Sequence, residues 1–145
     1  MYTIVVLMRI GVEGFSFDAA HYTTGITEKC LNIHGHTFRV DVEVEGEISG
    51  ETGMVIDFGL IKAIVKQVLE EWDHSVIIPK PDLDKIRIEG PFRVKVKVID
   101  EPAATTEYIA LNIAKEIGKQ LNLKVRVKVY EGFRNYAEAT FSRTA

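Results

Sequence analysis

The stretch GHTFRVDVEVEGEI, residues 35–48, decides the fold of this chain. Apolar and polar residues alternate along it, with one set made of Phe38, Val40, Val42 and Val44 and the other of Thr37, Arg39, Asp41 and Glu43. Successive side chains of a strand point to opposite faces of a sheet. The alternation therefore predicts a half-buried antiparallel strand, whose apolar face must be covered by another layer.

Two amphipathic helices are available to cover that face. Asp57 is a plausible N-cap for a helix over about Phe58–Trp72, in which the apolar residues at helical spacing are Ile61, Ile64, Val65, Val68, Leu69 and Trp72. A second helix is predicted over about Thr106–Leu121, with an inward face of Ala110, Ile113, Ala114, Ile117 and Leu121. Both helices can therefore pack on the sheet.

Further strands lie on either side of these helices. Tyr2–His21 reads as an extended strand, with a bulge or bend at Gly11 and Gly14. Pro79 and Pro81 predict an open loop, and residues 92–100 alternate again, with Val94, Val96 and Val98 on one side. Residues 124–131 and 137–142 flank GFRN and predict a closing hairpin. The order predicts an α+β fold with helices on one face of an antiparallel sheet.

Composition limits the class of protein. A chain of 145 residues and 16.3 kDa predicts a single domain over 1–145, and its one cysteine excludes an internal disulfide. The net charge of -3 and pI near 5.8 argue against nucleic acid as a partner and, more weakly, against a membrane surface. The apolar run Ile4–Met8 is too short for a secretion signal or a membrane span, which predicts a cytoplasmic protein.

Three of the four histidines fall where neighbouring strands can meet. His34 and His36 would project from one face of a strand, about 7 Å apart along it, and His21 ends the preceding strand. Three histidines without a fourth protein ligand are typical of a catalytic zinc, whose open position takes water or substrate. The alternative is that each histidine packs or hydrogen-bonds alone.

The only cysteine lies between these candidate ligands. Cys30 ends the polar segment TTGITEKC, where a nearby cation would favour the thiolate, so we interpret it as a working thiol. The alternative is a small buried apolar side chain.

The fourth histidine directly follows the first predicted helix. Asp73 could orient the His74 imidazole for proton transfer. The alternative is a histidine that satisfies carbonyls at the end of a helix.

The chain resembles the 6-pyruvoyltetrahydropterin and 6-carboxytetrahydropterin synthase family from Phe17 to about Glu131. The motifs that carry the resemblance, in order, are FDAAH, CLNIHGHTF, GMVIDFGLIK, WDH, ATTEYIA and VYE. The resemblance implies a tunnelling fold: a four-stranded antiparallel sheet backed by two helices that assembles into a barrel, commonly a homo-hexamer of two trimers. It also implies active sites between subunits.

Roles follow from the resemblance, residue by residue. The zinc ligands would be His21, His34 and His36; the thiol would be Cys30, working with Asp73 and His74; and the pterin would be held by Glu131, with Thr105, Thr106 and Glu107 beside it. A carboxylate suits the adjacent N–H donors of a pterin. Without the resemblance, Glu131 reads as a surface carboxylate and residues 105–107 as a helix N-terminus.

Three residues separate Cys30 from His34, as in the 6-carboxytetrahydropterin branch of the queuosine pathway. The resemblance thus implies zinc-dependent conversion of 7,8-dihydroneopterin triphosphate to 6-carboxytetrahydropterin, acetaldehyde and triphosphate. The alternatives are a 6-pyruvoyltetrahydropterin synthase and, given Glu28, cleavage of dihydroneopterin to 6-hydroxymethyl-dihydropterin. Two non-enzyme alternatives are a protein that only binds a pterin or purine and an assembly module with structural histidines.

Overall fold

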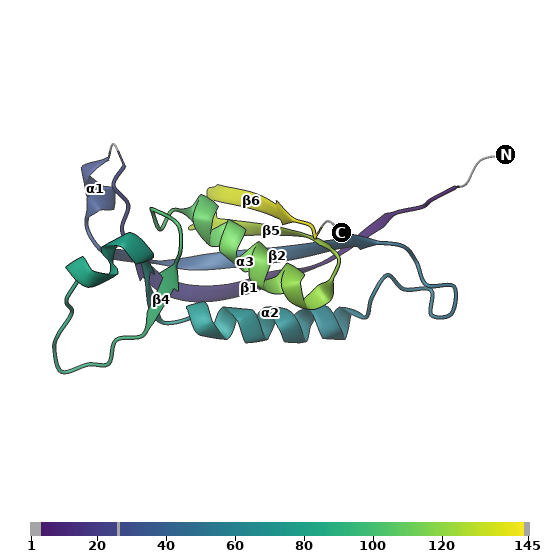
Figure 1. Ribbon diagram of the computed structural model, residues 1–145, viewed down its shortest axis with the longest axis horizontal. Coiled ribbons are helices and arrows are strands. Elements are labelled where there is room, and N and C mark those ends of the chain that lie inside the picture. The colour runs from purple at the N-terminus through teal and green to yellow at the C-terminus, as the bar shows by residue number, and fades with distance from the viewer. Residues whose placement is uncertain (1–3, 26, 144–145) are drawn as a thin grey trace.

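The computed structural model describes residues 4–25 and 27–143, and its centre is one six-stranded sheet (Figure 1). The strands are β1 (Met8–His21), β2 (His34–Gly46), β3 (Ser75–Pro79), β4 (Val96–Ile99), β5 (Lys124–Glu131) and β6 (Asn135–Phe141). The helices are α1 (Glu28–Leu31), α2 (Phe58–Trp72) and α3 (Thr106–Leu121), with a 3₁₀ helix, η1, at Lys80–Lys85. The α+β prediction is therefore confirmed.

The prediction of four strands is wrong. The strand order is β4-β3-β1-β2-β5-β6, in which β1, β2, β5 and β6 pair antiparallel as expected, while β3 and β4 add in parallel. The loop predicted over residues 79–91 is present beyond Pro79, apart from the turns of η1. Pro79 itself ends β3, where its missing N–H disturbs the ladder least.

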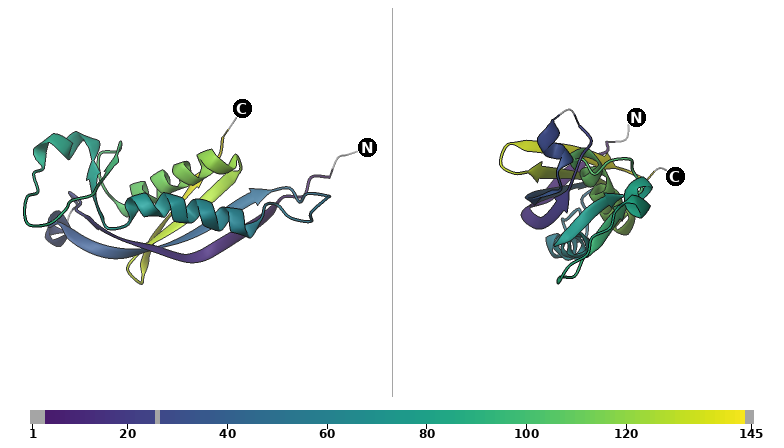
Figure 2. Two further views of the ribbon diagram at one scale, coloured as in Figure 1. Left: turned by 90° about the horizontal axis from the view of Figure 1, so that it is seen from below. Right: turned by 90° about the vertical axis from the view of Figure 1, so that its left-hand side faces the viewer.

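The predicted covering layer is confirmed. α2 and α3 both lie on one side of the bowed sheet (Figure 2). The predicted inward residues of both helices are buried, as are Phe38, Val40, Val42 and Val44 of β2. The side chain of Asp57 accepts a hydrogen bond from the N–H of Gly59 and caps α2 as predicted.

β1 carries the predicted bulge but is shorter than predicted. Its register with β2 shifts between Val12 and Phe15, and Gly14 has a φ of 82°, where the absence of a side chain removes the strain. β1 begins at Met8 because its partner β2 ends opposite, at Gly46. Residues 4–7 therefore have no strand to pair with, and Tyr2 lies outside the described residues.

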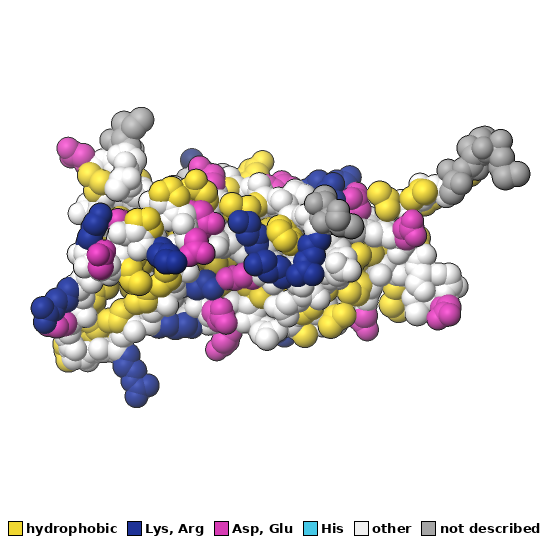
Figure 3. Space-filling model, viewed as in Figure 1, with side chains coloured by type: hydrophobic (Ala, Val, Ile, Leu, Met, Phe, Trp, Pro, Cys, Tyr) yellow, Lys and Arg dark blue, Asp and Glu magenta, His cyan; other side chains and the backbone are white. Residues whose placement is uncertain are grey.

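The strand predicted over residues 92–100 is confined to β4, because β3 offers it only four pairing positions, from Val76 to Pro79. Exposed apolar side chains gather near β4: Leu83, Phe92, Val94, Val96 and Val98. Acidic and basic side chains are interspersed over the face that carries α2 and α3 (Figure 3). Across residues 4–25 and 27–143, no helix is long and apolar enough to cross a membrane.

Candidate active site

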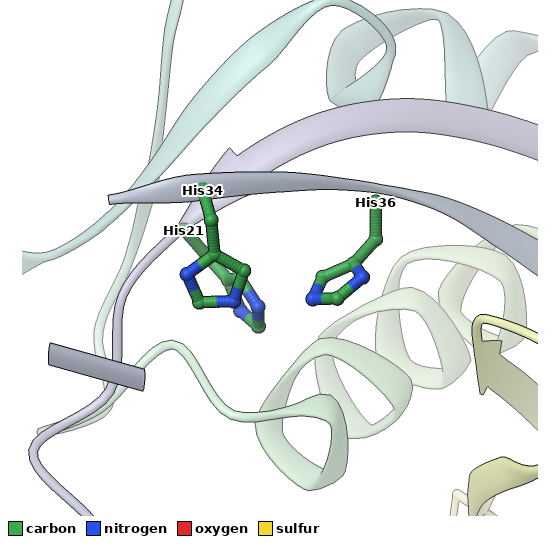
Figure 4. Close-up of side chains that lie close together, drawn as sticks. All are labelled: His21, His34 and His36. Carbon is green, nitrogen blue, oxygen red and sulfur yellow. The ribbon is translucent and has the colours of Figure 1, made fainter. Parts of the chain in front are cut away.

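Three histidine side chains converge from two neighbouring strands (Figure 4). His21, the last residue of β1, pairs directly with His34, the first of β2, and His36 follows on the same face. The ring centroids lie 4.7 Å apart for His21 and His34, 5.2 Å for His21 and His36, and 4.8 Å for His34 and His36. The cluster predicted from spacing is thus present.

Backbone carbonyls fix the orientation of two of these rings. Nδ1 of His21 lies 2.7 Å from the carbonyl oxygen of Ala104, and Nδ1 of His34 lies 2.6 Å from that of Asn32. A carbonyl only accepts, so each Nδ1 carries the proton and donates it. Nε2 is then left as the atom that can bind a metal.

His21 is the most constrained of the three. It is 2 % exposed, and its Nε2 is a buried polar atom without a hydrogen-bond partner among the described residues. Burial lowers the pKa of His21, against the opposing effects of the Ala104 carbonyl and Glu131, and so favours the neutral imidazole that metals require. One nitrogen from each histidine lies within 4.8 Å of the others, so the cluster can hold a metal ion.

Cys30 lies beside the histidine cluster and lines a surface hollow together with all three histidines. It lies in α1, a single helical turn rather than the loop expected, and it is partly buried. The N–H of Thr23 donates to the Cys30 carbonyl at 2.8 Å and closes the segment between them. Glu28 is exposed and is not among the residues that line the hollow.

The predicted pterin residues complete this hollow of about 490 Å³, within the range of small-molecule sites. Thr105 caps α3 by accepting from the N–H of Tyr108, and Thr106 Oγ1 donates to Glu131 Oε1 at 3.2 Å. The lining residues are His21, Thr23, Lys29, Cys30, His34, His36, Thr105, Thr106, Glu107 and Glu131. Sequence reasoning missed Thr23 and Lys29, although Lys29 adjoins the cysteine.

The Asp73–His74 pair lies elsewhere. His74 Nδ1 is 2.9 Å from Asp73 Oδ2, and the His74 side chain is 77 % exposed. His74 lines a second hollow with Asp18, Thr37, Ser75 and nearby residues of β1 and β2, and this hollow shares only His36 with the first. The structure therefore unites the histidines, Cys30 and residues 105–107 and 131, and leaves Asp73 and His74 apart from them.

Asp18 anchors this pair, a contribution that sequence reasoning missed. Its backbone N–H donates to Asp73 Oδ1 at 2.8 Å, and its carbonyl accepts from the N–H of His74 at 2.6 Å. The first of these bonds holds the pKa of Asp73 below its ordinary value, although burial opposes it. His74 has a φ of 58°, an uncommon conformation for a residue other than glycine.

The segment after β3 is tied to the same end of β1. The hydroxyl of Tyr22, next to His21, donates to Asp82 Oδ2 in η1 at 2.5 Å. Burial and this carboxylate raise the pKa of Tyr22 to about 12. The segment that follows Pro79, to which no role was assigned from sequence, is thus held beside a candidate metal ligand.

The chain is similar to known proteins along most of its length. The profile of the 6-pyruvoyl tetrahydropterin synthase family matches residues 9–141. This chain belongs to that family. A 6-carboxy-5,6,7,8-tetrahydropterin synthase of Rickettsia bellii is 36 % identical over 107 residues, covering 72 % of this chain and 77 % of the relative.

Two further similar proteins are a relative with a different named activity and a protein of known structure. A dihydroneopterin monophosphate aldolase of Pyrococcus furiosus is 39 % identical over 113 residues, covering 78 % of each chain. The crystal structure of 6-pyruvoyl tetrahydropterin synthase from Plasmodium vivax is 26 % identical and superposes with a TM-score of 0.77, covering 95 % of this chain and 99 % of the other. The tunnelling fold is therefore confirmed.

Proposed function

We propose that this chain converts 7,8-dihydroneopterin triphosphate to 6-carboxy-5,6,7,8-tetrahydropterin, with release of acetaldehyde and triphosphate. One observation carries the proposal: the three-histidine cluster, the only cysteine and Glu131 surround a single hollow. Membership of a tetrahydropterin synthase family supports a lyase-type enzyme. The name of the Rickettsia relative supports the 6-carboxy product.

The metal that the cluster would hold is zinc, on His21, His34 and His36. The ligand set fits, because the Nε2 atoms of His21 and His34 are left free by the backbone bonds to Nδ1. A zinc ion bound there would polarise a side-chain oxygen of the pterin and make the neighbouring C–H more acidic.

Each protein residue then has a separate task. Cys30, as thiolate, removes the proton from that carbon, while Glu131 accepts the N–H donors of the pterin ring. Thr106 steadies Glu131 by its hydrogen bond to Oε1, and Thr105 caps the helix that carries Thr106. With these roles, the reacting side chain of the substrate would lie near Cys30 and its pterin ring near Glu131 and α3.

His74, oriented by Asp73, exchanges protons with the side-chain oxygen, and we propose that it comes from a second copy of the chain. The separation of the two hollows within one chain supports this assignment. So does the part of β1 before Ala19, which pairs with a strand on one side only among the described residues. We propose a homo-hexamer of two trimers, in which these edges and the exposed apolar side chains near β4 are covered.

A specific observation favours a second candidate. The Pyrococcus relative is a dihydroneopterin monophosphate aldolase at 39 % identity, so cleavage of the side chain to a 6-hydroxymethyl-dihydropterin would use the same hollow. Both candidates leave one side-chain carbon on the ring, so they break the same carbon–carbon bond. They differ in the oxidation state of the carbon that stays, a carboxylate or a hydroxymethyl group, and in the phosphate that the substrate carries.

The test is to incubate the zinc-loaded protein with 7,8-dihydroneopterin triphosphate, and separately with the monophosphate, and to identify products by mass spectrometry. The proposal expects 6-carboxytetrahydropterin and acetaldehyde from the triphosphate. Cys30→Ser should abolish both products while the protein keeps its zinc. A 6-hydroxymethyl product would support the aldolase activity, and a 6-pyruvoyl product would support a 6-pyruvoyltetrahydropterin synthase activity.

A further inference from the structure

Glu131 lies closer to the histidine cluster than a residue that only holds the pterin ring needs to. Its Oε1 is 3.2 Å from Nε2 of His21 and 3.6 Å from Nε2 of His36. The register of β5 against β2, with Glu131 opposite Phe38, places the carboxylate on the same face as the histidines. The Glu131 side chain is 25 % exposed, so it is held within the protein surface.

These distances match the spacing of ligands around a metal. In a tetrahedral site with bonds of about 2.0–2.2 Å to nitrogen or oxygen, neighbouring ligand atoms lie about 3.4 Å apart. The two contacts of Glu131 Oε1 lie on either side of that value. The carboxylate oxygen thus lies at ligand spacing from two of the three histidines, His21 and His36.

A direct hydrogen bond does not explain the closer contact. The Nδ1 proton of His21 is donated to the Ala104 carbonyl, so the Nε2 of the neutral ring presents a lone pair. At 3.2 Å from the Glu131 oxygen this Nε2 makes no hydrogen bond among the described residues, and a cation, either a metal ion or a proton, would be attracted to both atoms. Thr106, which donates to the same oxygen, steadies the carboxylate but leaves its second oxygen free for another bond.

We propose that Glu131 is a fourth, exchangeable ligand of the metal in the substrate-free protein. This inference rests on the proposed function in one respect: when a pterin enters, its N–H edge takes the same carboxylate, and the metal position is freed for the substrate side chain. The exchange would keep the fourth coordination position occupied until substrate arrives, because the residue that recognises the pterin ring would also be the residue that occupies this position.

The experiment measures metal binding first, without any pterin. Zinc affinity is determined by competition with a chromophoric chelator for wild type, Glu131→Gln, Glu131→Asp and Glu107→Gln. Glu107 lines the same hollow and makes no ion pair or hydrogen bond with the histidines among the described residues, so its variant controls for the loss of one negative charge. Circular dichroism confirms that each variant is folded.

Glu131→Gln should weaken zinc binding roughly 10–100-fold, the range found for side chains that support a metal site, whereas Glu107→Gln should leave it within about 2-fold. Glu131→Asp keeps the charge but shortens the reach, so it should also weaken binding. Equal affinity in wild type and Glu131→Gln, or an equal loss in Glu107→Gln, would overturn the proposal.

The Co²⁺-substituted protein gives a second readout that does not depend on turnover. The visible absorption of wild type should differ from that of Glu131→Gln before substrate is added, and 7,8-dihydroneopterin should change the wild-type spectrum. Identical spectra in the substrate-free proteins would overturn the inference even if the enzyme were active. A spectral difference without turnover would uphold the fourth ligand and reject the proposed reaction instead.

Discussion

The histidine cluster and the Asp73–His74 pair are both built on the end of β1, yet they differ in almost every physical respect. The cluster lies on the helix-covered face, with His21 buried and two rings held by backbone carbonyls. His74 is 77 % exposed and has a left-handed backbone. A metal site needs its ligands preset, whereas a proton-transfer group can be completed by a partner.

The core beneath each region explains the difference in rigidity. Phe17 and Phe38 stack with ring centroids 5.0 Å apart, and the His21 ring packs against Phe38 at 5.5 Å. The Asp73–His74 pair is held mainly by hydrogen bonds instead: two to the backbone of Asp18, one from the Asp73 N–H to the Leu69 carbonyl, and one from Lys95 Nζ to the Asp73 carbonyl. Substitutions of neighbouring side chains should therefore disturb the geometry of the histidine cluster more than that of the Asp73–His74 pair.

The largest effect is expected from removing two ligands of the cluster. His34→Ala combined with His36→Ala should lower metal affinity by at least about 100-fold and abolish turnover, because two of three ligands are lost. Both side chains are only partly buried, so the fold should persist. Metal content after dialysis and circular dichroism check this, and full metal retention would show that the histidines are structural.

His74→Asn should distinguish the role of the Asp73–His74 pair from that of the histidine cluster. Asparagine adopts the left-handed conformation readily, so the backbone should be kept, while turnover should fall by about 10²–10⁴-fold through loss of the proton-transfer group. Zinc content should remain that of the wild type. A matching loss of zinc in this variant would mean that the two regions are one site within a single chain.

A mixture of inactive chains tests whether the two regions meet between subunits. Cys30→Ser and His74→Asn chains, dissociated and reassembled in equal amounts, should regain about a quarter of the wild-type activity, because random assembly pairs an intact Cys30 with an intact His74 in that share of sites. Each variant reassembled alone is the control. No recovery would place both groups in one chain.

The smallest effect concerns the tie between η1 and β1. Tyr22→Phe should lower the free energy of unfolding by about 1 kcal/mol at neutral pH, because the hydrogen bond to Asp82 is lost. Since the pKa of Tyr22 is raised to about 12, its contribution is fully present below the ordinary pKa of tyrosine and is lost as the pH rises from there through the raised value. Chemical denaturation measures the first effect.

An alkaline absorbance titration measures the second. One tyrosine of the wild type should ionise near pH 12 and be missing from Tyr22→Phe. In Asp82→Asn the same tyrosine should ionise nearer its ordinary pKa, because the neighbouring negative charge is gone. An unchanged titration in Tyr22→Phe would show that the phenol is not held by η1.

Several elements could be read from the sequence because their signals are local. The alternation in β2, the Asp57 cap of α2, the helical spacing in α3 and the hairpin around GFRN each depend on residues close together in the chain. The histidine cluster was also predictable, since residues two apart share a face of a strand and only twelve residues separate His21 from His34.

Other features depended on pairing between distant segments. The parallel addition of β3 and β4, the anchoring of Asp73 by Asp18 and the approach of Glu131 to His21 join residues that are 20 to 110 positions apart, as counted from the sequence numbers. No local period encodes such a register. The sequence by itself determined most of the elements and the candidate metal ligands, whereas only the tertiary structure decided which face each candidate catalytic group occupies, because that follows from which strands pair.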